Sequence, residues 1–275
     1  MERANLLSAA NPVRALRASF LALLVLTLAE AAVAADFDTG WQAYQRGDFV
    51  AAQEQWWPLA EQGDARAQYN LGILFDQGKG VRQDAARAVE LWREAAELGY
   101  SAAQHNLASS LIAGEGSPQD FVAAIAWLKK AANQGLARSQ YTLGKMYDAG
   151  LGVEADAEEA FFWVRKAAQQ GFDRAQYSLG KMYRDGAGTR ANLETSFRWF
   201  LRAAKQGYAK AQDKVGARYA RGEGVAKDEA RALAWTTLAA DQGFAAALER
   251  RKEFLAHLNA EAVREAERLV REWQR

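Results

Sequence analysis

The chain has 275 residues, half of them apolar and a quarter charged, with a formal net charge of +1. These values are typical of a folded protein and exclude bulk disorder. The sequence has no cysteine, which excludes disulfide bonds, thiol catalysis, cysteine-ligated metals and a lipid-modified cysteine anchor.

The first 34 residues have the pattern of a secretory signal peptide. Three arginines precede a short apolar run, FLALLVLTLA (20–29), and the small residues AVA (32–34) offer a cleavage site. The apolar run is shorter than the about 20 residues that a membrane-spanning helix needs. No later apolar stretch is long enough either. We therefore expect cleavage of residues 1–34, no stable membrane insertion afterwards, and a periplasmic or secreted product.

A strict 36-residue repeat occupies most of the remaining chain. Glycines recur at that spacing without insertion or deletion, at Gly63, Gly99, Gly135, Gly171, Gly207 and Gly243. Tryptophans keep the same register at Trp127, Trp163, Trp199 and Trp235, with Leu91 in the equivalent earlier place. Self-similarity of this kind is the signature of a repeat architecture.

Each repeat predicts two helices. The first, as in DRAQYSLGKMY (173–183), carries Ala175, Leu179 and Tyr183 on one helical stripe and ends at paired glycines. The second begins at a residue type that caps helices well. These predicted N-caps are Asp48, Asp84, Asp120, Asp156, Asn192 and Asp228. The tryptophan register would supply a large side chain for packing.

Glycine also recurs inside the first helices, at Gly72, Gly144, Gly180 and Gly216. Because glycine weakens a helix by about 1 kcal/mol relative to alanine, the recurrence indicates a close approach by a neighbouring helix. Ala108 occupies the same register in the second unit, which predicts space for a methyl group.

The pattern A-Q-x-x-L-G-x-x-Y-x-x-G-x-G-V, followed by D-x-x-x-A-x-x-W-x-x-x-A-A-x-Q-G, resembles Sel1-like repeats, a branch of the tetratricopeptide-like helical repeats. The resemblance implies an all-α, right-handed α-solenoid built from helix-turn-helix units with capping helices. It divides the chain into a signal peptide (1–34), an N-terminal capping half-repeat (36–63), five repeats (64–243), and a degenerate repeat with a C-terminal capping helix (244–275). Members of the family are adaptors that assemble protein complexes, many of them exported by bacteria.

Catalytic chemistry finds little support in the sequence. His105 and His257 are the only histidines and lie on different units, so a shared metal or catalytic site is not expected. The QGKGV segment (77–81) lacks the spacing of a phosphate-binding loop. We expect no enzymatic activity, no catalytic residue, no metal and no cofactor.

The feature with functional content is a row of basic residues on the first helices, opposite the predicted buried stripe. In the third to fifth units this row forms a predominantly basic strip, flanked by Tyr69, His105, Tyr141, Tyr177 and Asp213. The candidate partner-binding residues are Arg66, Arg138, Tyr141, Lys145, Arg174, Tyr177, Lys181, Lys210 and Lys214. A plain solvated face is the competing interpretation, with the tyrosines packing between units.

The charge distribution agrees with an acidic partner. Residues 35–134 carry 8 basic and 13 acidic groups, whereas residues 135–275 carry 24 and 19. A field of this kind steers an acidic partner toward the C-terminal half.

We therefore predict a non-enzymatic scaffold of the bacterial cell envelope that holds an acidic peptide or protein surface in its concave groove. The alternatives are binding of an acidic polysaccharide or peptidoglycan fragment, and a hydrolase acting on β-lactam or cell-wall substrates, which the missing cysteines disfavour. Nucleic acid is not an expected partner, and homo-oligomers are compatible with the sequence.

Overall fold

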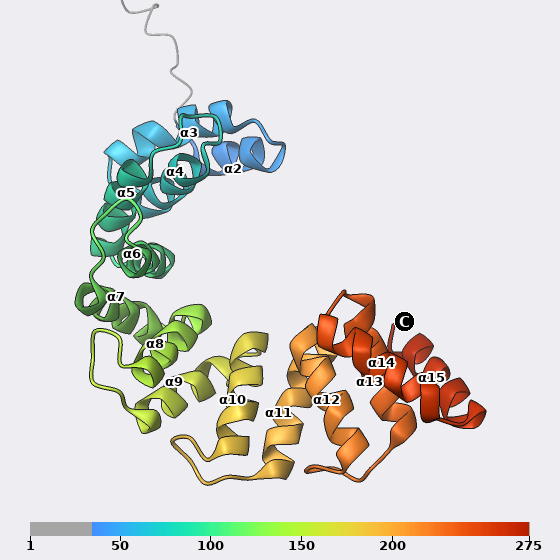
Figure 1. Cartoon of the computed structure of the whole chain (residues 1–275). Helices are drawn as coiled ribbons and strands as arrows, with labels where there is room; N and C mark the ends of the chain where they lie inside the picture. The colour runs from blue at the N-terminus through green and yellow to red at the C-terminus, as the bar shows by residue number, and fades with distance from the viewer. Residues whose placement is uncertain (1–34, 275) are drawn as a thin grey trace, which may run out of the picture.

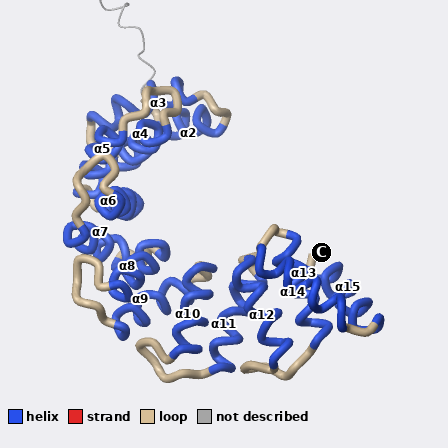
Figure 2. The backbone as a smooth tube through the Cα atoms, in the orientation of Figure 1, coloured by secondary structure: helices blue, strands red, loops and turns tan. Residues whose placement is uncertain are grey.

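The computed structural model describes residues 35–274, which form fourteen helices and no strand (Figure 2). The predicted signal peptide lies outside the described residues. The first helices of the units are α2 (Phe37–Gln45), α4 (Ala65–Gln77), α6 (Ser101–Ala113), α8 (Ala137–Ala149), α10 (Asp173–Asp185), α12 (Ala209–Arg221) and α14 (Ala245–His257). The second helices are α3 (Phe49–Glu61), α5 (Ala85–Glu97), α7 (Phe121–Asn133), α9 (Ala157–Gln169), α11 (Leu193–Lys205), α13 (Glu229–Asp241) and α15 (Ala260–Trp273).

The helices stack into a curved array (Figure 1). Through α13, each second helix packs against the first helix of its own unit and against the first helix of the next unit. In Figure 1, α6 and α8 lie toward the inside of the bend, and α7 and α9 lie toward its outside. The predicted α-solenoid of 36-residue two-helix units is confirmed. No helix among residues 35–274 is both long and apolar enough to cross a membrane.

Helix boundaries follow the predicted capping residues. All six predicted N-caps accept a hydrogen bond from the backbone N–H three residues later, as Asp84 does from Arg87. The paired glycines end the first helices: Gly186 and Gly188 have φ of 74° and 64°, a region that other residues enter only at a cost.

The glycines inside the first helices mark a close helix–helix approach, as predicted. A Cβ atom added at Gly180 would lie 2.8 Å from the Phe200 ring, and one at Gly72 would lie 2.4 Å from Trp92 Nε1. Space for a methyl group is therefore absent at these two positions. The prediction drawn from Ala108, which is itself fully buried, was wrong for them.

The side chains that contact the glycines inside the first helices lie one residue after the positions of the tryptophan register. They are Trp92, Val164, Phe200 and Thr236. Trp127 and Trp199 are only half-buried, and cations lie over their rings: Lys130 Nζ is 3.8 Å from the Trp127 centroid, and Arg202 Cζ is 4.4 Å from the Trp199 centroid. These two tryptophans therefore do not supply the tightest contact between the helices of a unit.

A ladder of buried glutamines joins the units. In each of five first helices, a glutamine Nε2 donates to the carbonyl oxygen of an alanine eight residues earlier, as Gln140 does to Ala132 at 3.0 Å. The Oε1 atoms of four of them accept a hydrogen bond from the glutamine that precedes the next repeat glycine. These bonds are Gln134 to Gln104, Gln170 to Gln140, Gln206 to Gln176 and Gln242 to Gln212, at 2.7–2.9 Å.

The glutamine–glutamine hydrogen bond is absent from the first repeat. Leu98 occupies the place of the donating glutamine, and its side chain is 59% exposed. Gln68 Oε1 is consequently buried without a hydrogen-bond partner in the described part of the chain.

The C-terminal helix departs from the repeat. Only Leu258 and Asn259 separate α14 from α15, and α15 packs mainly on α13 instead of forming a hairpin with α14. Ala266 and Leu269 are its buried residues, and the Trp273 ring stacks on Trp235 with centroids 4.5 Å apart.

Candidate functional site

The predicted basic strip lies along the first helices α4, α8, α10 and α12. Its basic members are Arg66, Arg138, Lys145, Arg174, Lys181, Lys210 and Lys214. Arg138 and Lys214 are half-buried, and the other five are exposed. Helix α8, which carries Arg138 and Lys145, lies toward the inside of the bend (Figure 1).

Two of these charges already have partners. Arg66 pairs with Asp64 at 3.0 Å, and its guanidinium lies 4.3 Å from the centre of the Phe37 ring. Lys145 pairs with Asp148. None of the ion pairs found within residues 35–274 involves the remaining five members, Arg138, Arg174, Lys181, Lys210 and Lys214. The uncompensated positive charge of the strip is therefore concentrated on the third to fifth units.

A small depression lies between Lys145 and Lys181, which occupy the same register in successive units. It has a volume of about 100 Å³ and is lined by Lys145, Lys181, Asp148 and Asp185 between α8 and α10. The pKa of Asp185 is lowered mainly by its hydrogen bond with Arg184, and Lys181 adds a smaller effect. Lys145 is paired with Asp148 and Asp185 with Arg184, so Lys181 is the lysine of this depression that has no ion-pair partner among the described residues.

The tyrosine row packs between neighbouring units. Tyr141 meets Phe172 edge-on at 5.4 Å between centroids, and Tyr177 meets Tyr208 in the same way at 5.3 Å. Burial raises the pKa of Tyr177. Both rings are half-buried, so much of the aromatic area that the sequence offers to a partner serves contacts between units.

The two histidines have separate environments. His105 Nδ1 is 2.9 Å from Ser139 Oγ, and burial, aided by the charge of Arg138, lowers the histidine pKa to about 4. His257 is exposed, and its ring bonds the backbone oxygen of Glu253 in the same helix. Residues 35–274 contain no group of three potential metal-ligating side chains.

Asp213 takes the place of a tyrosine in the flanking row but does not face a groove. Its side chain is buried and pairs with Arg250 of the next unit. In the same helix, Arg218 is buried in a register that elsewhere holds leucine, serine or methionine, and its guanidinium donates to the Glu223 carbonyl oxygen at 3.2 Å. The fifth unit therefore has an internal polar network that the sequence pattern did not indicate.

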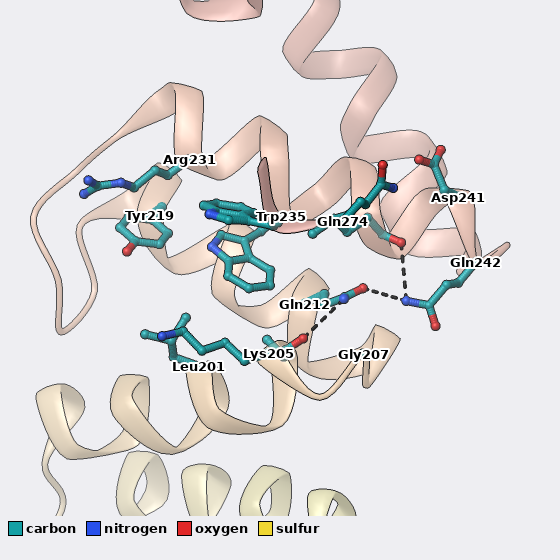
Figure 3. A pocket seen from close by; sticks show the side chains of 13 residues that line it. Leu201, Lys205, Gly207, Gln212, Tyr219, Arg231, Trp235, Asp241, Gln242 and Gln274 are labelled. Carbon is teal, nitrogen blue, oxygen red and sulfur yellow. Dashed lines mark hydrogen bonds between the residues drawn. The ribbon is translucent and has the colours of Figure 1, made fainter. Parts of the chain in front are cut away.

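A larger pocket lies at the C-terminal end, where no site was predicted (Figure 3). We call it the C-terminal pocket; its volume is about 760 Å³. Leu201 and Lys205 come from α11, Tyr219 from α12, and Arg231, Trp235, Leu238 and Asp241 from α13, while Trp273 of α15 closes one wall. Sequence reasoning missed it because it depends on where α15 folds back. The sequence feature that could have indicated this pocket is the pair Leu201 and Leu238, which occupy registers held by cations in the middle units.

A family model and a solved structure indicate the family of this chain. The model of the Sel1 repeat matches five consecutive segments, 65–100, 101–136, 137–172, 173–208 and 209–244. The crystal structure of a Sel1 repeat protein from Oxalobacter formigenes is similar to this chain, with 28% identity over 86% of this chain and 94% of that one, and a TM-score of 0.74.

Two further solved structures are more distant. A protective antigen of uropathogenic Escherichia coli with an SLR fold is 25% identical over 86% of this chain and 67% of its own, with a TM-score of 0.42. The immunity protein Pa5087 of Pseudomonas aeruginosa is 27% identical over 66% of this chain and 67% of its own, with a TM-score of 0.44. A search of curated proteins gave no match.

The matched segments reproduce the 36-residue period and the paired helices seen in the structure. The chain belongs to the Sel1 repeat family.

Proposed function

We propose that this protein is a non-enzymatic scaffold of the bacterial cell envelope that holds an acidic segment of a partner protein along its first-helix face. Sel1 repeat proteins are generally protein-interaction scaffolds and typically not enzymes. The envelope location rests on the signal-peptide pattern of residues 1–34.

One observation carries the proposal. Arg138, Arg174 and Lys210 occupy the same register in three successive units, and none of them forms an ion pair among the described residues. Arg138 Nε is also buried without a hydrogen-bond partner there. A regular row of unpaired cations suits an extended chain that carries carboxylates, since each unit then offers one contact.

The glycan alternative has weaker support. Sugars are commonly held against open aromatic faces, but Tyr141 and Tyr177 are half-buried and contact aromatic rings of the next unit. The strip therefore presents positive charge but little exposed aromatic surface, which favours an acidic peptide over a glycan.

The test is a triple charge reversal, Arg138→Glu, Arg174→Glu and Lys210→Glu, in a chain beginning at residue 36. Binding of fluorescent deca-glutamate, followed by anisotropy, should weaken about 10- to 100-fold, because three favourable charge contacts become repulsive. The matched control reverses Arg93, Lys129 and Arg165, exposed cations in one register of the second helices.

Both triple variants change the charge by the same amount, so net charge alone would affect them equally. The control should bind within about twofold of the unmodified protein if the strip is the site. Equal losses in the two variants would refute the proposal. Displacement of the peptide by a neutral peptidoglycan fragment, with an affinity that does not depend on salt, would show that the strip binds glycan instead of an acidic peptide.

A further inference from the structure

Grooves between successive second helices carry a recurring set of side chains. One register, on the earlier helix of each groove, holds Trp57, Arg93, Lys129, Arg165 and Leu201 in successive units. A second register, on the later helix, holds Glu94, Lys130, Lys166, Arg202 and Leu238. The middle three grooves are therefore basic at both positions. The groove between α11 and α13 is different, because leucine occupies both.

The two leucines make the C-terminal pocket apolar. In the middle units a cation lies over the tryptophan ring, as Arg202 does over Trp199. At Trp235 the residue three positions later is Leu238, and Trp273 of α15 stacks on the ring instead. Leu201 and Leu238 are half-buried, so part of each side chain remains accessible.

The position of α15 creates the wall of the C-terminal pocket that Trp273 forms. The α13 residues Ala234 and Thr237 are small and uncharged, where the preceding unit has Arg198 and Leu201. A helix can approach such a surface closely, and the two-residue link after α14 directs α15 toward it. The pocket is thus a product of the terminal units, and its volume of about 760 Å³ is within the range of binding sites for small ligands and peptide anchors.

The charges at the edge of the pocket favour an anion. Lys205 is exposed and takes part in none of the ion pairs within the described residues. Arg231 has a side chain that is 52% exposed and reaches Asp228 at 3.5 Å. The one carboxylate that lines the pocket, Asp241, is paired with Arg251 at 2.7 Å.

From this combination we propose that the C-terminal pocket binds a large apolar side chain of an acidic peptide segment in a partner protein. The apolar side chain lies between Leu201, Leu238 and the Trp235–Trp273 stack. Carboxylates of the same segment meet Lys205 and Arg231 at the edge. This site is separate from the basic strip, so the protein offers two surfaces to acidic chains, one electrostatic and one mainly apolar.

The probe is anilinonaphthalene sulfonate, an aromatic anion whose emission rises when it enters an apolar site. The test variant is the double substitution Leu201→Arg and Leu238→Lys, which installs the side-chain types that Arg165 and Lys166 hold in the same two registers of an earlier unit. The emission at saturation should fall at least about tenfold in this variant, because the apolar walls are lost. The strip variant Arg138→Glu, Arg174→Glu and Lys210→Glu should keep the emission of the unmodified protein.

Peptide competition tests the charge preference. A pentapeptide EEFLE should displace the probe at a concentration at least about tenfold lower than KKFLK or EESSE, since only the first has both features. In the variant Lys205→Glu with Arg231→Glu, which keeps the apolar walls, KKFLK should become the better competitor. Circular dichroism confirms the helical content of each variant before binding is measured.

Three outcomes would overturn the proposal. The first is equal probe emission in the unmodified protein and in the Leu201→Arg, Leu238→Lys variant, and the second is equal competition by the three peptides. The third is concentration-dependent self-association that only the leucine substitutions abolish, which would assign the pocket to a second copy of this chain.

Discussion

The missing glutamine–glutamine bond of the first repeat gives a sharp test of what holds the two helices of a unit together. Gln68 Oε1 is buried without a partner, and Leu98 occupies the place from which Gln134, Gln170, Gln206 and Gln242 donate in later units. The substitution Leu98→Gln should supply the missing donor. It should therefore stabilise the protein, although it replaces an apolar residue by a polar one.

The magnitude follows from the environment of the acceptor. An unsatisfied buried polar atom costs about 1–3 kcal/mol, and ordering a glutamine side chain offsets part of that gain. Leu98 is 59% exposed, so its removal sacrifices little apolar burial. We expect a net gain of about 1 kcal/mol, which corresponds to a rise in melting temperature of about 2–4 °C for a protein of this size.

The assay is urea denaturation followed by circular dichroism at 222 nm. The matched control is Gln170→Leu, which reproduces the defect at Gln140 and should cost about 1–2 kcal/mol. A second control repeats Leu98→Gln in a Gln68→Met background, where the acceptor is absent. If the gain persists undiminished in that background, the hydrogen bond is not its cause and the reasoning fails.

Three other predictions concern packing and pH. Gly180→Ala should destabilise the protein by about 1–3 kcal/mol in thermal unfolding, despite the better helix propensity of alanine, because the added methyl group meets Phe200 at 2.8 Å; an increase in stability would show that the helices can separate without cost. His105 has a folded pKa of about 4, below its unfolded value near 6.5, so stability should be lost as pH falls from about 6.5 toward 4. His105→Tyr, which installs the residue type of neighbouring units, should remove on the order of 2 kcal/mol of that loss, and an unchanged pH profile in urea denaturation would contradict the assignment. Trp273→Ala should destabilise the α13–α15 contact by about 2 kcal/mol and change the near-ultraviolet circular dichroism of Trp235; an unchanged spectrum would contradict the stacking.

The sequence predicted the regular part of the fold because each unit repeats the same local chemistry. The helix pairs, the capping aspartates and the close approach at Gly180 all depend on residues within one period. A register also tells which residues share a helix face, and this placed Arg138, Arg174 and Lys210 in one row.

The features that were not predicted depend on contacts between periods. Tyr141 was proposed to face a partner, but the ring of Phe172 from the next unit reaches it first. Asp213 was placed beside the strip, but Arg250 lies within reach and the pair becomes buried. At the C-terminus the repeat stops, so register gave no information on α15. Its position depends on a short link and on the small residues of α13.

The missing glutamine–glutamine bond at Leu98 also makes the first repeat unequal to the others in internal stability. In a solenoid, stability is approximately a sum of unit energies and couplings between neighbours, so a unit with a smaller internal energy opens more readily. The four later repeats each have a glutamine–glutamine bond between their own two helices, whereas the first repeat has none, although Gln104 still couples it to the second through Ala96. Helices α4 and α5 would thus separate more readily than the helix pairs that carry the unpaired cations, leaving these cations on the part of the array that stays folded longest.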